Sequence, residues 1–416
     1  MEEKVLSAAP LFFAATEKTP NTFVRSFDFE DAVDGAILRR AVDKTMERYL
    51  YFAVQTAVED GWYVLRPNPA PVPVYESAAS RPLGGEANNG HLLAFRYHEN
   101  TVYFEFFHGL GDGSGTTPLL QTLLYYYCRE KYDDTLSPEG IRLAGDPIPE
   151  EEILDPYPDS VSEDIQPCGR YVIREAVRLF KGDRTGLFIA YVKVPEKEFM
   201  DFAKPRDGSP ATMMSLLMAR AVREELGQTE LPIICAMAMD IRPVLKKLLA
   251  HHSVVSQLFL EYGEKMASLP LETQATAFRG MVLLQSQPEN VLTSVRNNLR
   301  FVENLRQMDS LDARRRFMQG IVERSMTMSS FKFSYPGRLD LGVAEKYIKN
   351  QLIYPDITGA GLMLEVAAHG GFFHISFLQE YEDERYYRAF LRQLDAMRLP
   401  YEAGKFVPYA VPGVEL

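Results

Sequence analysis

Hydrophobic and polar residues alternate along residues 21–30, NTFVRSFDFE, with the period of a half-buried β-strand. The following segment, residues 34–50, places its apolar residues at helical spacing and is predicted to be an amphipathic helix. Short strand-like runs come next, at residues 52–58 and 62–65. The chain is therefore predicted to open with a strand, an amphipathic helix and further strands.

Two apolar runs then meet at a polar junction. HLLAFRYHEN and TVYFEFFH, which together span residues 91–108, are joined at Glu99-Asn100, and this pattern predicts a β-hairpin. A glycine-dense turn follows, after which residues 118–132 carry leucines at helical spacing. Residues 133–169 are rich in Pro, Asp and Glu and show no period, which is typical of a crossover or linker segment.

The second half of the chain restates this alternation of strands and helices. Its predicted strands span 186–195, 231–239, 330–341, 361–371 and 372–381, and its predicted helices span 210–226, several segments between 271 and 322, and 383–397. We therefore expect an α/β protein of two similar halves. The boundary is placed near residue 180, so that the predicted domains are residues 1–180 and 181–416.

Size and composition are compatible with this picture and narrow the range of partners. The 416 residues exceed the roughly 250–300 beyond which single hydrophobic cores tend to stop growing. Lys and Arg number 45 against 57 Asp and Glu, which gives a net charge of −12, and no long basic block is present. A nucleic-acid partner is therefore not expected.

The cysteines and the N-terminal residues indicate the cellular compartment in which the protein is expected. Cys128, Cys168 and Cys235 are widely spaced and form no CxxC pair, so neither a disulfide framework nor a thiolate zinc site is indicated. The apolar stretch from Leu6 to Thr16 is too short to span a membrane, and the glutamates before it do not suit a signal peptide. We expect a cytoplasmic protein with no membrane span.

Residues 104–127, FEFFHGLGDGSGTTPLLQTLLYYY, carry the main candidate chemistry. The glycines are spaced GxGxGxG rather than GxGxxG, and Asp112 would put a carboxylate inside an anion cradle, so a dinucleotide site is disfavoured. Ser114 lacks the flanking glycines of a nucleophile elbow. The remaining chemical interpretation is proton transfer at His108.

His108 is suited to act as a general base, because a neutral imidazole held in one tautomer can accept a proton near neutral pH. Asp112 could pair with an arginine and lock the turn without touching a substrate. The alternative is a histidine that merely satisfies its own hydrogen bonds at a strand end. His369 and His374 flank the Gly-Gly hairpin and could share a metal ion, but Glu365 is the only acidic residue near them, so no metal site is expected.

The segment FHGLGDG, residues 107–113, resembles the HxxxDG signature of the CoA-dependent acyltransferase superfamily. That superfamily includes chloramphenicol acetyltransferase, the condensation domains of nonribosomal peptide synthetases, and alcohol acetyltransferase-like proteins. The position of the motif agrees, since a predicted strand precedes it and a predicted helix follows. Supporting similarities lie in AVDKTMERYLYFAV (41–54), AMAMDIRPVL (235–244), FSYPGRL (333–339) and GLMLEVAAHGGFFHISFLQEYED (361–383).

The resemblance implies two chloramphenicol-acetyltransferase-like lobes, each a mixed sheet with flanking helices, with a channel between them. It implies an acyltransferase that moves an acyl group from acyl-CoA, or from an acyl carrier thioester, to a hydroxyl or amine acceptor. No cofactor would be bound permanently, because acyl-CoA is a co-substrate. The partners would be a small-molecule acceptor and a thioester donor, with an acyl carrier protein as an alternative source of the donor.

The same resemblance assigns His108 as the general base, with Asp112 and Gly113 completing the motif. Ser334 is the candidate for hydrogen bonding the tetrahedral oxyanion, and the alternative is an ordinary strand hydroxyl. Arg242 and Arg48 are both candidate partners for Asp112, since a buried carboxylate needs a charged or hydrogen-bonded mate.

The sequence also departs from the family pattern. Phe107 stands where many members carry a first histidine, and the single tryptophan, Trp62, excludes the DFGWG motif of the plant branch. We find no adenylation or carrier segment in these residues, so a stand-alone enzyme that uses free acyl-CoA is expected. The alternative function is a non-catalytic, condensation-domain-like protein that binds an acyl thioester or a protein partner.

Overall fold

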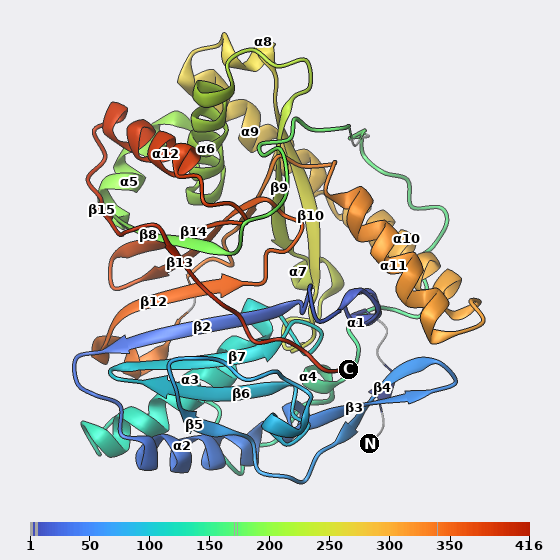
Figure 1. The fold of residues 1–416 in the computed structure, drawn as a ribbon, viewed down its shortest axis with the longest axis vertical. Coiled ribbons are helices and arrows are strands. Elements are labelled where there is room, and N and C mark those ends of the chain that lie inside the picture. Colours follow the sequence, from blue (N-terminus) through green and yellow to red (C-terminus); the bar gives the residue numbers. More distant parts are fainter. Residues whose placement is uncertain (1–2, 5–6, 170, 173, 339) are drawn as a thin grey trace.

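The computed structural model describes residues 3–4, 7–169, 171–172, 174–338 and 340–416. Within these residues the strands form one sheet of three strands, one of five and one of eight, and the helices pack against them (Figure 1). The expected α/β class with mixed sheets is confirmed.

The five-stranded sheet carries the glycine-dense turn. Its order is β12 (Ile348–Pro355), β2 (Thr22–Phe29), β7 (Thr101–Phe107), β6 (Leu93–His98) and β5 (Val74–Glu76). Neighbouring strands are antiparallel except β5 and β6, which are parallel. Helices α2 (Gly35–Arg48) and α3 (Gly113–Lys131) pack on this sheet, and their apolar side chains share one hydrophobic cluster with it (Figure 1).

One strand of this sheet comes from far along the chain. β12 pairs antiparallel with β2, with Ile353 opposite Arg25 and Pro355 opposite Phe23. The five-stranded sheet thus takes an edge strand from beyond residue 180. The division of the chain into residues 1–180 and 181–416 stays a prediction.

The eight-stranded sheet is also mixed. Its order is β10 (Val255–Tyr262), β9 (Ile233–Asp240), β11 (Phe331–Ser334), β13 (Leu362–His369), β14 (Phe372–Gln379), β8 (Phe188–Pro195) and β15 (Glu402–Ala403), and β16 (Val407–Pro408) also pairs with β8. β11 lies parallel to β9 and β13, and the other pairs are antiparallel.

One face of the eight-stranded sheet is covered by helices. These are α5 (Glu196–Ala203), α6 (Pro210–Leu226), α9 (Leu271–Gln285) and α12 (Arg385–Ala396), which gather above the sheet in Figure 1. Alternate strand residues such as Phe331, Phe333 and Leu364 enter the core beneath these helices. The other face is therefore left to meet the five-stranded sheet.

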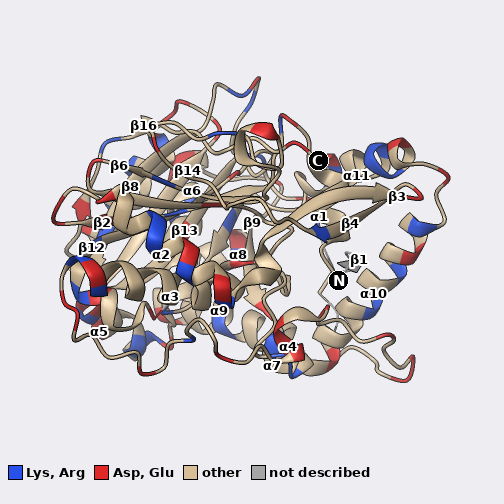
Figure 2. Cartoon of the chain, turned by 90° about the horizontal axis from the view of Figure 1, so that it is seen from below, with Lys and Arg blue, Asp and Glu red and all other residues tan. Residues whose placement is uncertain are grey.

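The three-stranded sheet and its neighbours lie to one side of the molecule. The sheet contains β1 (Glu3–Lys4), β4 (Trp62–Pro67) and β3 (Val54–Glu59), near helices α1 (Ala9–Ala14), α10 (Pro288–Arg306) and α11 (Leu311–Ser325). Short α-helical turns are α4 (Glu150–Ile153), α7 (Arg242–Leu245) and α8 (Glu264–Ala267), and 3₁₀ turns span Leu50–Phe52, Glu86–Asn88, Lys204–Arg206 and Gly342–Tyr347. Figure 2 shows acidic and basic residues interspersed along α10 and α11 rather than separated by sign.

Most predicted elements are present, with informative differences. The helix predicted over 210–226 is α6, and the hairpin predicted at Glu99-Asn100 joins β6 to β7. The helix expected to begin at Pro118 begins at Gly113, because Asp112 caps it. The strand expected over 330–341 ends at Ser334, and β10 and β12 were not predicted.

None of the helices within the described residues combines the length and the apolar character needed to cross a lipid bilayer.

Candidate active site

A cavity of about 630 Å³ lies where the two large sheets face each other. Its wall includes side chains of β2 from the five-stranded sheet and of β9, β11 and β13 from the eight-stranded sheet. The turn before α3 contributes His108, Asp112 and Gly113. Three of the four predicted site residues therefore lie on one side of this cavity, and Ser334 lies on β11 across it.

Strand alternation explains which side chains reach the cavity from the eight-stranded sheet. Phe331 and Phe333 point into the core under the helices, so Lys332 and Ser334 point the opposite way. The parallel register of β11 and β13 places Ser334 beside Glu365. A polar pair thus faces the cavity from neighbouring strands.

His108 is held by the strand that precedes it and by an aromatic neighbour. Its backbone N–H donates to the carbonyl of Asn21 at 2.8 Å, which extends the pairing of β7 with β2 by one residue. Its ring packs against that of Phe23, with the ring centroids 4.4 Å apart. Both contacts fix the direction of the imidazole.

The hydrogen bond of His108 selects its tautomer. Nδ1 lies 2.9 Å from the carbonyl oxygen of Gly111, and because a carbonyl can only accept, Nδ1 carries the hydrogen. Nε2 then keeps its lone pair. Burial lowers the pKa of His108 below its ordinary value, so the ring is neutral near pH 7. This is the protonation state that a general base requires.

Asp112 is fully engaged by the protein. One carboxylate oxygen accepts from the backbone N–H of Gly115 and from Nη2 of Arg242, each at 2.8 Å, and the other accepts from the backbone N–H of Val254 at 2.9 Å. The first bond caps α3, and the other two tie the turn to α7, which begins at Arg242, and to the segment after it. Asp112 therefore positions the turn and has no free oxygen for proton transfer.

Of the two candidate partners of Asp112, the structure selects Arg242. Arg48 instead forms a bidentate pair with Glu152, with both N–O distances 2.9 Å. Glu152 also accepts from Arg142 at 2.7 Å, and its backbone carbonyl accepts from the backbone N–H of His251 at 3.2 Å. Arg48 therefore does not contact Asp112. It binds Glu152, which in turn holds the segment that contacts Asp112.

The glycine spacing of the turn follows from close backbone approach. A Cβ at Gly115 would lie 2.0 Å from the carbonyl oxygen of His251, and one at Gly111 would lie 2.7 Å from the same atom. At Gly113 the nearest atoms belong to the Pro336 side chain, at 3.7 Å, which is ordinary contact. The Asp112 carboxylate occupies the start of α3, where a cofactor phosphate would otherwise bind, so a dinucleotide cradle is not formed.

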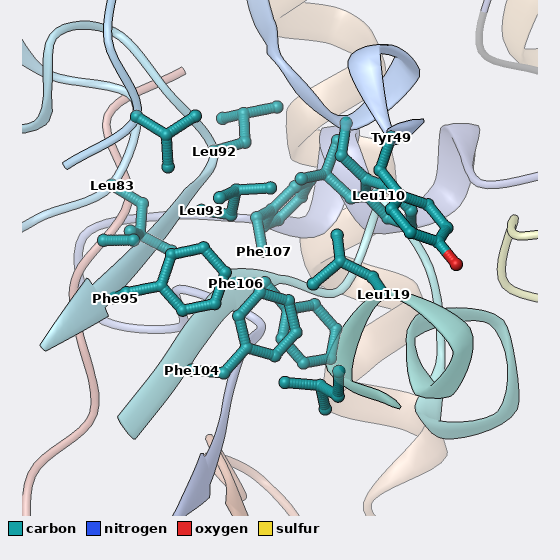
Figure 3. Close-up of a cluster of buried hydrophobic side chains, with 14 of the residues drawn as sticks. Tyr49, Leu83, Leu92, Leu93, Phe95, Phe104, Phe106, Phe107, Leu110 and Leu119 are labelled. Carbon is teal, nitrogen blue, oxygen red and sulfur yellow. The ribbon is translucent and has the colours of Figure 1, made fainter. Parts of the chain in front are cut away.

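Phe107, the departure from the family pattern, points away from the cavity. It lies in the hydrophobic cluster of the five-stranded sheet, as Figure 3 shows, and its ring meets that of Phe12 edge-on with centroids 4.8 Å apart. Neighbouring strand residues point to opposite faces, so His108 and Phe107 occupy different environments. A histidine at position 107 would not reach the cavity.

Two charged residues that the sequence did not single out lie on the cavity wall. Arg25 is 0% exposed; its Nη1 donates to Thr117 Oγ1 at 3.0 Å, while Nε and Nη2 have no hydrogen-bond partner. Glu365 is 3% exposed; its Oε1 lies 2.7 Å from Ser334 Oγ, and Oε2 has no partner. Burial lowers the pKa of Arg25 to about 9 and raises that of Glu365 to about 8.

A weak sequence signal marks both residues. Arg25 occupies an inward position of an alternating strand, and Glu365 interrupts the apolar run LMLEVAAH. Charged residues at buried strand positions are uncommon, so such positions are candidates for a functional site.

The two histidines considered for a metal ion each bond to a backbone carbonyl through Nε2, while His369 Nδ1 has no hydrogen-bond partner. His369 Nε2 bonds to the Ile348 carbonyl at 2.8 Å. His374 Nε2 lies 3.2 Å from the His369 carbonyl, and its Nδ1 lies 2.7 Å from the Tyr191 hydroxyl. Among the residues that the structure describes, no group of three or more His, Cys, Asp or Glu side chains is placed to hold a metal ion.

Comparison with known proteins identifies the fold. No protein-family model matches the chain, and a search of curated proteins gives no match. Solved structures match over nearly its whole length. Polyketide synthase associated protein 5 from Mycobacterium tuberculosis is 14% identical with a TM-score of 0.61, over 94% of this chain and 96% of that one.

Two further structures were solved with ligands. F. graminearum TRI101, complexed with coenzyme A and deoxynivalenol, is 14% identical with a TM-score of 0.60, over 96% of this chain and 99% of that one. A starter condensation domain of rhizomide synthetase, in complex with C8-CoA and Leu-SNAC, is 14% identical with a TM-score of 0.56, over 95% of this chain and 93% of that one. The mixed α/β fold expected from the resemblance to CoA-dependent acyltransferases is confirmed, and the channel between two lobes stays a prediction.

Proposed function

We propose that the protein is an acyltransferase that moves an acyl group from acyl-CoA, or from an acyl carrier thioester, to a hydroxyl or amine acceptor. The main support is His108, whose Nδ1–H bond to Gly111 leaves Nε2 as a free base on the wall of a cavity between two sheets. The solved structures of similar fold that contain coenzyme A or C8-CoA support a thioester donor.

In the proposed reaction, Nε2 of His108 accepts the proton of the acceptor hydroxyl or amine while its oxygen or nitrogen attacks the thioester carbonyl. Collapse of the tetrahedral intermediate breaks the carbon–sulfur bond. The thiolate that leaves takes the acceptor's proton from the imidazolium, which restores the neutral base. Holding both reactants in one cavity supplies the orientational part of the rate enhancement.

The other motif residues support this step from a distance. Asp112 and Arg242 hold the turn, and Gly113 lines the cavity next to them, with the Pro336 side chain as its nearest neighbour. Ser334, on the opposite sheet, is the proposed hydrogen-bond donor to the oxyanion. We further propose that donor and acceptor enter the cavity from opposite sides, as ends of one channel.

The test is release of free thiol from acyl-CoA in the presence of alcohols and amines, with the native protein and with His108→Ala. Loss of a general base predicts a fall in kcat of about 10²- to 10⁴-fold. His98→Ala is a matched control, because His98 also ends a strand of the same sheet but does not line the cavity. Equal turnover by the native protein and His108→Ala would contradict the proposal.

The same purified protein also tests the alternative function, that of a non-catalytic binding protein. Phe107 and the weakness of the other family similarities suggest this alternative, but the Phe107 side chain faces the core rather than the cavity. Calorimetric binding of acyl-CoA without thiol release on any acceptor would favour a binding protein.

A further inference from the structure

The carboxyl group of Glu365 has an unusual set of contacts for a buried acid. Oε1 lies 2.7 Å from Ser334 Oγ, and Oε2 has no hydrogen-bond partner. An ionised carboxylate needs partners on both oxygens, and a bare charged oxygen in the interior carries a large desolvation cost. The contacts therefore suit the neutral acid better than the anion.

The surrounding groups do not supply the missing hydrogen bond, although the charge of Arg25 acts on Glu365 and lowers its pKa against the larger, raising effect of burial. The titratable groups that line the same cavity are Arg25 on β2, His108 and Asp112 on the turn, Asp240 on β9, Lys332 and Tyr335 in and after β11, and Asp356 after β12. Asp112 and Asp240 both pair with Arg242. The ion pairs found among the described residues do not include one between Arg25 and Glu365. The cross-strand neighbour on β14 is the uncharged Ser376.

The position of the proton on the neutral acid follows from the same contacts. A hydrogen on Oε2 would be a buried donor without an acceptor, whereas a hydrogen on Oε1 points at Ser334 Oγ. The carbonyl oxygen is then the atom left bare, which is the less costly arrangement. In the neutral acid, therefore, Glu365 donates in this hydrogen bond and the Ser334 oxygen accepts.

The direction of this bond decides what Ser334 can do. A serine hydroxyl has one hydrogen. If Glu365 were ionised, Ser334 would spend that hydrogen on the carboxylate. With Glu365 as the donor, the hydroxyl hydrogen of Ser334 is free to rotate into the cavity.

We propose that Glu365 is a positioning residue for acyl transfer, whose protonated carboxyl group donates to Ser334 and thereby makes the Ser334 hydroxyl a donor to the oxyanion. This inference rests on the proposed function. Glu365 does not touch the reacting atoms; it sets the direction of the hydrogen bond that Ser334 makes. Burial, which raises the pKa of Glu365 to about 8, agrees with a neutral acid at physiological pH.

The first experiment is the pH dependence of kcat with an alcohol acceptor. The native rate falls as the pH rises through about 8, because ionised Glu365 withdraws the Ser334 hydrogen from the oxyanion. In Glu365→Gln the amide N–H donates to Ser334 at every pH, so activity persists and the alkaline fall disappears. Glu365→Ala and Ser334→Ala each lose a large part of the roughly 10²- to 10³-fold supplied by one oxyanion donor.

Lys332→Gln is the matched control. Lys332 lines the same cavity, and burial lowers the pKa of its ammonium group, so it is one competing source of an alkaline fall; Arg25, whose pKa burial lowers to about 9, is the other, and Arg25→Met is tested beside it. The fall is expected to remain in Lys332→Gln and in Arg25→Met. An alkaline fall that survives in Glu365→Gln, or that vanishes in either control variant, would overturn the proposal.

A second readout does not depend on turnover. The infrared difference between native protein and Glu365→Gln is expected to contain the carbonyl stretch of a protonated carboxyl group at neutral pH, and to lose it above about pH 8. Absence of this band at neutral pH would overturn the hydrogen-bond direction. A protein with the band but without acyl transfer would contradict the proposed function instead, and Glu365→Ala with native kcat would overturn the positioning role.

Discussion

Two buried carboxyl groups, those of Asp112 and Glu365, border the same cavity and differ in how completely their hydrogen-bonding capacity is satisfied. At the turn, both oxygens of Asp112 accept hydrogen bonds, and Arg242 lies 2.8 Å away. Between the sheets, Glu365 leaves Oε2 bare and Arg25 leaves Nε and Nη2 without partners. A fully hydrogen-bonded network stabilises one geometry. Buried polar atoms without partners destabilise the fold, and such atoms are found where a site binds a ligand or takes part in a reaction.

The comparison distinguishes a carboxylate that holds the backbone in place from a carboxyl group that can change its protonation state. Asp112 belongs to the recognisable motif, yet its contacts make it part of the scaffold of the turn. Glu365 belongs to no motif, yet its contacts leave its protonation open to change. Substitutions at the two places should therefore differ in their effect on the free energy of unfolding.

The largest effect is expected from Arg242→Met. This change leaves the Asp112 carboxylate buried with no cation, and breaking a buried pair in this way costs about 3–5 kcal/mol. Urea unfolding of the native and variant proteins measures the loss. A loss below about 1 kcal/mol, the range of exposed pairs, would show that Asp112 is not held as the contacts indicate.

The next effect concerns the close approach at the turn. Gly115→Ala puts a Cβ against the His251 carbonyl and is expected to destabilise the fold by about 1–3 kcal/mol through overpacking. Gly113→Ala is the matched control, because its added Cβ meets only Pro336 at ordinary distance. Equal losses of unfolding free energy in the two variants would argue against close approach as the reason for glycine.

A third effect, small within any one pH unit, separates the two places by pH. Because folding raises the pKa of Glu365 from its ordinary value of 4.5 to about 8, the folded state holds an extra proton between these values. Its stabilising contribution is complete below about pH 4.5 and is lost as the pH rises to about 8. Unfolding free energies of native protein and Glu365→Gln should diverge across this range, by at most about 1.4 kcal/mol per pH unit. Parallel curves would contradict a neutral Glu365.

The smallest effect is expected from Arg25→Met. Arg25 is buried with two nitrogens unpartnered, and its removal leaves a neutral Glu365 rather than an unpaired charge. The free energy of unfolding is therefore expected to change by less than about 1 kcal/mol, in contrast to Arg242→Met. Chemical denaturation of Arg25→Met and Arg242→Met under the same conditions measures both free energies of unfolding. Similar large losses in the two variants would contradict the proposed difference between them.

The sequence predicted the motif well because its determinants are local. The apolar run before His108, the glycines after it and the leucines of α3 lie within one short segment, so strand, turn and helix could be predicted together. The choice between Arg242 and Arg48 could not be made, since both arginines are buried and both pair with a carboxylate.

The remaining features depend on contacts between distant parts of the chain. β12, IKNQLIYP, contains Lys, Asn, Gln and Pro, and its alternation is too weak to mark an edge strand. Arg25 and Glu365 come together only because β2 and β13 belong to sheets that face each other. No short window of sequence contains that information.

The late arrival of β12 has a consequence for biosynthesis. At about 5–20 residues per second, a ribosome needs roughly 16 to 64 s to travel from the end of β2 to the start of β12. During that time one edge of β2 has no partner strand in the nascent chain, and unpaired edges of this kind invite association with other polypeptides. Chaperones that shield extended segments during translation should therefore influence the yield of folded protein more than the stability of the finished fold would suggest.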